Sequence, residues 1–216
     1  MQVFNEYFRG DHGSATVPSA ELAYIVSPHL GLVLDIPVQI GIDNQTTGLE
    51  DLNLLVQYLA TGSLDHDAMV SLGVSATFPT GRGDLSEGDY LVGPFAYGAK
   101  RWFDHLVVEG NVTGLLSVVH GASTRQLLAN GMVAVMVTPR RFDYPIYAQV
   151  EVDSTTTTRT GALFVAPEVF VGPFESPIDK GTRLAAGVSF ELAGDPVHRQ
   201  TYMVTIAFDI PNKYGY

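Results

Sequence analysis

Hydrophobic and polar residues alternate with a period of two along most of this chain. The clearest case is LGLVLDIPVQI, in which every even position from Leu30 to Ile40 is a large aliphatic residue. Successive side chains of a β-strand point to opposite faces of its sheet, so the pattern predicts a strand with one aliphatic and one mixed face. Similar stretches recur at 22–26, 52–60, 68–78, 91–99, 106–118, 127–137, 142–152, 163–171, 184–192 and 202–210.

Most of these stretches are longer than the roughly five or six residues of a typical strand in a soluble protein. Their length fits the roughly 9 to 11 residues that a tilted strand needs to cross a bilayer. Residues 2–8 add a partial strand, which makes about twelve, and bacterial transmembrane barrels have even strand numbers. Tight turns such as 27–29 alternate with longer polar links such as 79–89 and 153–160. We predict an all-β chain that forms a transmembrane antiparallel up-and-down β-barrel.

One stretch also supports a helix. In GLEDLNLLVQYLATG, apolar residues from Leu49 to Leu59 fall at helical spacing, with Thr47 as a candidate N-cap. The neighbouring strands favour a strand at this place.

Nothing marks a domain boundary, so we expect a single barrel domain over 1–216, in which 1–20 holds the partial first strand and a loop, and 211–216 is a C-terminal tail.

The placement of charge indicates which face meets lipid. The aliphatic face of the clearer stretches has no charged residue, Asn, Gln, Ser or Thr, and the opposite face is small or soft rather than rich in Lys and Glu. Of the Lys and Arg residues, only Lys100 and Arg183 belong to expected strands, and both lie near a strand end on the inward face. Because Lys or Arg facing lipid costs roughly 2–4 kcal/mol at the midplane, we expect the aliphatic face to meet lipid. Aromatic residues near strand ends, among them Phe95, Tyr97 and Trp102, fit interfacial girdles.

Composition removes several classes of protein. The net charge of -11 argues against nucleic acid, which needs a basic patch, and the absence of Cys excludes disulfides and thiolate metal sites. No run of apolar residues is long enough for a transmembrane helix. The first residues lack the features of a signal peptide, so we expect a leader to have been removed or the chain to be a fragment.

The face opposite the aliphatic one holds the candidate solute path. Carboxylates inside its strands predict a cation-favouring lumen, and the alternative is that they are merely solvated or held by Tyr hydroxyls. Inward Met residues, with Leu55, Leu59, Leu115 and Val92, predict a soft lining for hydrophobic solutes, and the alternative is plain packing of a narrow interior. The candidate lumen-lining residues are Asp35, Asp51, Glu109, Tyr147, Gln149, Glu151, Glu168, Arg183, Glu191, Met69, Met132, Met136 and Met203.

No motif for catalysis or metal binding is present. The six His residues fall in or beside expected turns without a metal-ligand spacing, and no Gly-x-Ser-x-Gly elbow occurs. We therefore expect no catalytic residues, no metal and no cofactor.

Three segments together resemble a known family: GLEDLNLLVQYLA (48–60), VSLGVSATFPTGRGD (70–84) and DYLVGPFAYG (89–98). They are similar to bacterial outer-membrane transporters associated with the meta-cleavage pathway of phenol degradation. Gly48, Leu49 and Asp51 match a strand start of the Gly-Leu-Gly-Asp type, in which Glu50 replaces the second Gly, and the segment 79–81 matches its Pro-Thr-Gly. The resemblance implies an outer-membrane β-barrel that moves small, often hydrophobic or aromatic, molecules.

The sequence therefore predicts a channel in the bacterial outer membrane, with lipid and small solutes as its partners and no enzyme activity. Other membrane or envelope proteins stay open as partners. Two alternatives are a structural outer-membrane barrel without a transport role, and a soluble secreted β-barrel that binds an apolar ligand inside its aliphatic face.

Overall fold

The computed structural model describes residues 2–10, 13–42, 45–63, 68–102, 105–119, 125–138, 145–157, 160–174, 182–194 and 200–207. Almost all of them lie in antiparallel strands. The strands are β1 (Gln2–Gly10), β2 (Gly13–Ser27), β3 (Leu30–Gly41), β4 (Gly48–Leu49), β5 (Leu52–Ser63), β6 (Ala68–Phe78), β7 (Leu91–Trp102), β8 (Leu106–Ser117), β9 (Arg125–Met136), β10 (Ile146–Thr157), β11 (Gly161–Phe174), β12 (Thr182–Ala193) and β13 (Gln200–Ala207).

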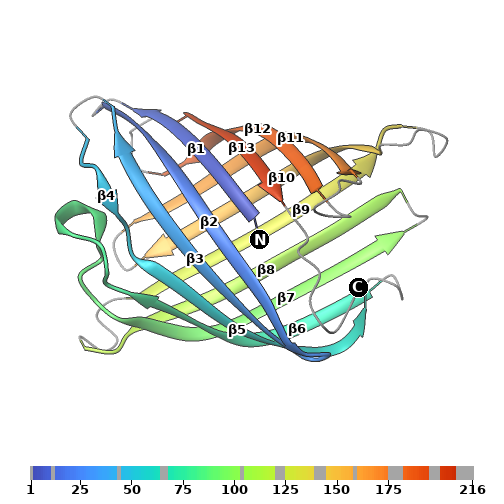
Figure 1. The fold of residues 1–216 in the computed structure, drawn as a ribbon, viewed down its shortest axis with the longest axis horizontal. Helices are drawn as coiled ribbons and strands as arrows, with labels where there is room; N and C mark the ends of the chain where they lie inside the picture. The colour runs from blue at the N-terminus through green and yellow to red at the C-terminus, as the bar shows by residue number, and fades with distance from the viewer. Residues whose placement is uncertain are drawn as a thin grey trace.

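The strands close into a barrel. Apart from the short β4, each strand pairs with the next strand along the chain, with β3 pairing with β5, and β1 pairs with β13. The two-residue β4 and the longer β5 both pair with β3, β4 with Val38 and Gln39 and β5 with residues 30–35. These two strands share one position in the wall, so the thirteen strands make a ring of about twelve positions. Figure 1 shows the strands running obliquely side by side around the barrel. Closure leaves the wall of the described strands without an open sheet edge, as a lipid environment requires.

The predicted strand pattern is confirmed, with two differences at strand ends. Residues 52–63 form β5, so the helical alternative was wrong. β2 begins at Gly13, where a loop up to residue 20 was expected, and β10 continues to Thr157, where a polar loop was expected. In β10 the Thr-rich end pairs with β11, because Thr suits a strand as well as a loop. The predicted tail 211–216 lies outside the described residues.

The outer surface of the barrel is aliphatic, as predicted. Large apolar side chains are exposed on it away from the ends of one strand after another: Val56, Leu72, Val74, Val112, Val133, Val150 and Val169. A soluble barrel would turn these side chains inward. The soluble alternative was therefore wrong, and the surface suits a hydrocarbon environment.

Exposed aromatic residues flank the aliphatic band at both rims. At the rim that holds the β2–β3 turn they are Tyr24, Tyr58 and Trp102, and at the opposite rim they are Phe78, Tyr90, Phe190 and Tyr202. The amino group of Lys100 lies 5.9 Å from the centre of the Trp102 ring. An amphipathic ring beside a cation suits the level of lipid headgroups.

The predicted faces of β7 were wrong. Leu91 is 1% exposed and Val92 is 39% exposed, so the odd positions of this strand point inward. Tyr97 and Phe95 therefore lie inside the barrel rather than in a girdle, whereas Val92 and Lys100 point outward. The sequence LVGPFAYGA carries apolar or small residues at both parities, so its alternation does not distinguish the two faces.

Across the described residues, no helix is long and apolar enough to span a membrane.

Candidate functional site: the barrel interior

An acidic wall crosses the inner face of strands β8 to β11. Glu109 accepts a hydrogen bond from the Tyr97 hydroxyl at 2.9 Å. On the next strand, β9, the Asn130 amide donates to Asp153 of β10 at 2.6 Å and also to Glu151 of the same strand. Glu109, Asp153 and Glu168 all act electrostatically on Glu151. The interior therefore concentrates negative charge on one side of the barrel.

The same wall continues with an amide–carboxylate pair. The Gln149 amide donates to the Glu168 carboxylate, and the two residues lie opposite each other in the β10–β11 register. Glu168 extends over Gly187 of β12, where the side chain of any other residue would collide with it. The absence of a side chain at Gly187 thus provides the space that the Glu168 side chain occupies.

Sulfur and aromatic side chains lie between these carboxylates. Met132 stands opposite Glu109 on one side and opposite Glu151 on the other. Met136 is the register partner of Tyr147, whose ring centre lies 5.6 Å from that of Phe170. The wall is therefore mixed, with soft groups placed beside charged ones.

A second acidic position faces inward from β2 and β3. Glu21 and Asp35 are register partners, and Asp35 also pairs with Asn53 of β5. Both carboxylates are partly buried and interact electrostatically with each other. Carboxylates thus occur on two separate parts of the inner surface.

The remaining candidate residues lie apart from the acidic wall. Glu191 is the register partner of Phe164, and Met69 is that of Ala99. Arg183 is exposed at the start of β12, and the side chain of Met203 in β13 lies outside the described part. Within the described strands, inward carboxylates outnumber the inward basic residues Arg101 and Arg183. The role of all these residues in solute passage stays a prediction.

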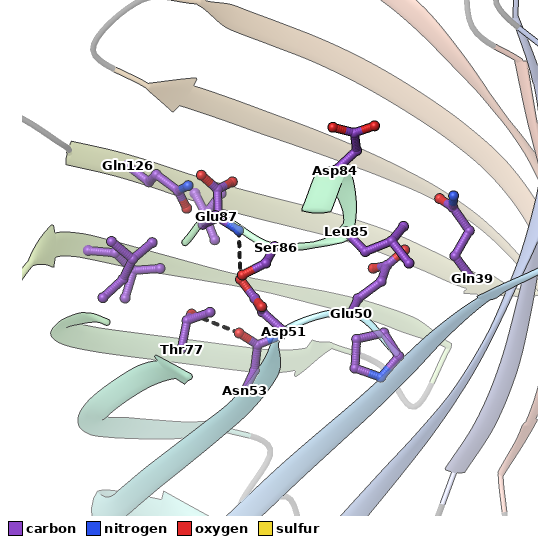
Figure 2. A pocket seen from close by; sticks show the side chains of 14 residues that line it. Gln39, Glu50, Asp51, Asn53, Thr77, Asp84, Leu85, Ser86, Glu87 and Gln126 are labelled. Carbon is purple, nitrogen blue, oxygen red and sulfur yellow. Dashed lines mark hydrogen bonds between the residues drawn. The ribbon is translucent and has the colours of Figure 1, made fainter. Parts of the chain in front are cut away.

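A cavity of about 600 Å³ opens at the mouth of the barrel, at the rim opposite the β2–β3 turn. Its walls come from the inner faces of β3, β5, β6, β7, β8 and β9. The segment Asp84–Glu87 forms a further wall and belongs to the connection between β6 and β7, residues 79–90, called the β6–β7 loop below. Figure 2 shows this segment near Glu50 and Asp51, with Gln39 to one side of it and Gln126 to the other.

Asp51 fastens this loop to the barrel wall. One of its carboxylate oxygens accepts the backbone N–H of Gly81 at 3.0 Å and the other accepts that of Glu87 at 2.8 Å. The Thr80 hydroxyl adds a second link, because it donates to the Glu50 carbonyl and accepts from the Leu52 N–H, each at 3.0 Å. Asp51 is only 8% exposed and both of its oxygens accept loop amides, so it anchors the loop, and it also lines the cavity. Its predicted place on the solute path stays a prediction.

The residues that carry the family resemblance meet at this anchor. Asp51 binds the Gly81 amide, and Thr80 bridges the residues on either side of Asp51. At Gly48 an added Cβ would lie 3.0 Å from the Leu85 side chain, so the glycine makes room for the loop. The motif residues therefore have a shared structural role at the mouth.

The sequence reasoning missed several interior residues. Tyr97 was assigned to the wrong face, whereas Asn130, Asn53 and Thr77 lie at inward positions of correctly assigned strands. Thr77 donates to Asn53 at 2.8 Å beside the cavity. An Asn or Thr at an inward parity was the available signal. Among the described residues, no group of three or more His, Asp or Glu side chains is arranged to hold a metal ion.

Solved structures with the same fold are outer-membrane proteins. The NanC porin aligns at a TM-score of 0.65 and 14% identity over 97% of this chain and 99% of that one. An outer membrane channel from Pseudomonas putida F1 aligns at 0.58 and 14%, covering 95% of each chain. The KdgM porin in complex with disordered oligogalacturonate aligns at 0.56 and 11%, over 97% of this chain and 100% of that one.

These similarities show that the chain has the β-barrel fold of outer-membrane porins and channels. No protein-family model matches the sequence, and no curated protein matches it.

Proposed function

We propose that this protein is a passive channel for small solutes in the bacterial outer membrane. The observation that carries the proposal is the reversal of faces: a closed barrel exposes aliphatic side chains outward and places carboxylates, amides and hydroxyls inward. Such a surface distribution suits a barrel with lipid outside and water or solute inside. The porin and channel neighbours support the same reading through their shared fold.

The charge of the inner wall favours neutral and cationic solutes over anions. Glu109, Glu151, Asp153 and Glu168 form one acidic group, and a carboxylate-lined path raises the local concentration of cations. Screening by salt should weaken this preference, because the Debye length falls from about 10 Å at 0.1 M to about 3 Å at 1 M.

A second candidate is a channel for small hydrophobic or aromatic solutes, as the family resemblance implies. It is supported by Met132 and Met136 on the inner wall, by the Tyr147–Phe170 ring pair, and by the leucines of the mouth cavity. Thioether and aromatic groups bind apolar guests with little directional demand. A connection with phenol degradation would follow from this candidate.

Reconstitution in planar bilayers and liposomes tests both versions. A hydrophilic channel should give discrete ohmic steps, a reversal potential that favours K⁺ in a KCl gradient, and swelling with small sugars. A hydrophobic channel should give small conductance but faster entry of an apolar aromatic probe. Vesicles that received heat-unfolded protein serve as the control. Folded protein without conductance or uptake would instead support the structural barrel without transport.

A further inference from the structure

We infer that Asp51 is a positioning residue that holds the β6–β7 loop across the barrel mouth and thereby limits the size of the solutes that pass. The inference rests on the proposed channel function. It concerns one carboxylate and the seven-residue segment 81–87 whose two ends that carboxylate binds.

The loop has a shape of its own but needs an attachment to the barrel. Its turn is held by the bonds Leu85 N–H to Arg82 O at 3.2 Å and Ser86 N–H to Gly83 O at 3.3 Å. Gly83 has a φ of +59° and Gly88 a φ of +69°, which glycine adopts without strain. These features shape the turn, but none of them fixes its direction relative to the lumen.

Asp51 supplies that direction. Its two oxygens bind amides at both ends of the segment, across sequence separations of 30 and 36 residues. Hydrogen bonds to a largely buried carboxylate are among the stronger ones in proteins. Loss of this carboxylate leaves the backbone N–H groups of Gly81 and Glu87 without their acceptor. Beside Gly48, the Leu85 side chain packs against the wall in support of the same position.

The anchored position places the loop over the lumen. The cavity at the mouth is bounded by Asp84, Leu85, Ser86 and Glu87 on the loop side and by Leu115, Gln126 and Leu128 on the β8–β9 side. Residues of the loop and of the opposite wall therefore face the same space of about 600 Å³ (Figure 2). Release of the loop removes one boundary of this space and widens the mouth.

Three variants separate anchoring from charge. Asp51→Ala removes both acceptors and the charge, whereas Asp51→Asn removes the same charge but keeps one acceptor oxygen. A third variant retains Asp51 and replaces residues 82–88 by Asn-Gly, a preferred two-residue hairpin turn. The heat-dependent gel shift and the urea midpoint of each variant report whether the barrel has folded.

Single-channel conductance and liposome swelling with a series of sugars provide the readout. We expect a several-fold higher conductance and a larger size limit for Asp51→Ala and for the shortened loop, with an intermediate effect for Asp51→Asn. Equal effects of the two Asp51 variants, with no effect of the shortened loop, would assign the change to charge and overturn the inference.

If all three variants fold and conduct like the wild-type protein, the inference about Asp51 is overturned, while the proposed channel function stands. Absence of conductance and of swelling in the wild-type protein would instead contradict the proposed channel itself. If Asp51→Ala fails to fold, the shortened loop and Asp51→Asn still decide between these outcomes.

Discussion

The orientation of the barrel wall predicts opposite effects for two neighbouring residues of β9. Val133 is 45% exposed on the outer face, where it pairs with Val108 and Val150. Met132 points inward between Glu109 and Glu151. We expect Val133→Arg to prevent or strongly weaken insertion, and Met132→Arg to be tolerated. Both variants introduce the same side chain at nearly the same depth, so only the face differs.

The expected difference follows from the environment on each side. Arg on the lipid face of a barrel costs roughly 2–4 kcal/mol near the midplane, which corresponds to a roughly 30- to 700-fold fall in the folded-to-unfolded ratio. At position 132 the guanidinium replaces a long flexible side chain and meets two carboxylates, so we expect a change of at most about 1 kcal/mol. Ala134 is a poorer inward control, because it is only 5% exposed and leaves Arg no room.

Urea titration of folding into lipid vesicles measures this difference, with the fluorescence of Trp102, the single tryptophan, as the signal. The gel shift between heated and unheated samples provides an independent measure of the folded fraction. Val74→Arg and Ser75→Arg on β6 repeat the comparison on another part of the wall. Equal losses within each pair, or a larger loss for the inward variant, would refute the assignment of the faces.

Three further predictions concern selectivity, membrane depth and packing. Neutralising Glu109 and Glu151 to Gln should shift the reversal potential in a KCl gradient toward zero while the urea midpoint changes little; an unchanged reversal potential would remove these carboxylates from the ion path. Trp102 should be quenched by lipids brominated near the headgroups more strongly than by lipids brominated at the chain ends, and the reverse order would contradict its placement at the rim. Gly93→Ala should destabilise the barrel by about 1–3 kcal/mol, because a Cβ there collides with the Gly114 carbonyl across the β7–β8 pair; an unchanged urea midpoint would show that the strands separate freely.

The chemistry of a lipid-facing surface explains why much of the fold was readable from the sequence. A strand with one face in hydrocarbon must exclude charge from every second residue, so the period-two pattern and its parity are fixed together. This constraint identified the outward positions of most strands, from Leu32 to Val204. It failed on β7, where Pro94, Ala96 and Gly98 make the outward face small rather than aliphatic. In β7 the face is decided only by the strand register, which places Phe95 opposite the inward Gly73 of β6 and Thr113 of β8.

The sequence by itself determined the strand order, the length of the strands and the outer surface, because these depend on residues that are close along the chain. The tertiary structure decided what happens inside. Asp51 was predicted only as a residue of the solute path, and its second role as an anchor arises because closure of the β5–β6–β7 meander brings the Gly81 and Glu87 amides to it. Likewise, Glu109 and Glu151 share one wall only because the register of β8, β9 and β10 places both of them opposite Met132 of the intervening strand. Alternation assigns a residue to a face, whereas its partners on that face depend on strand register and loop docking.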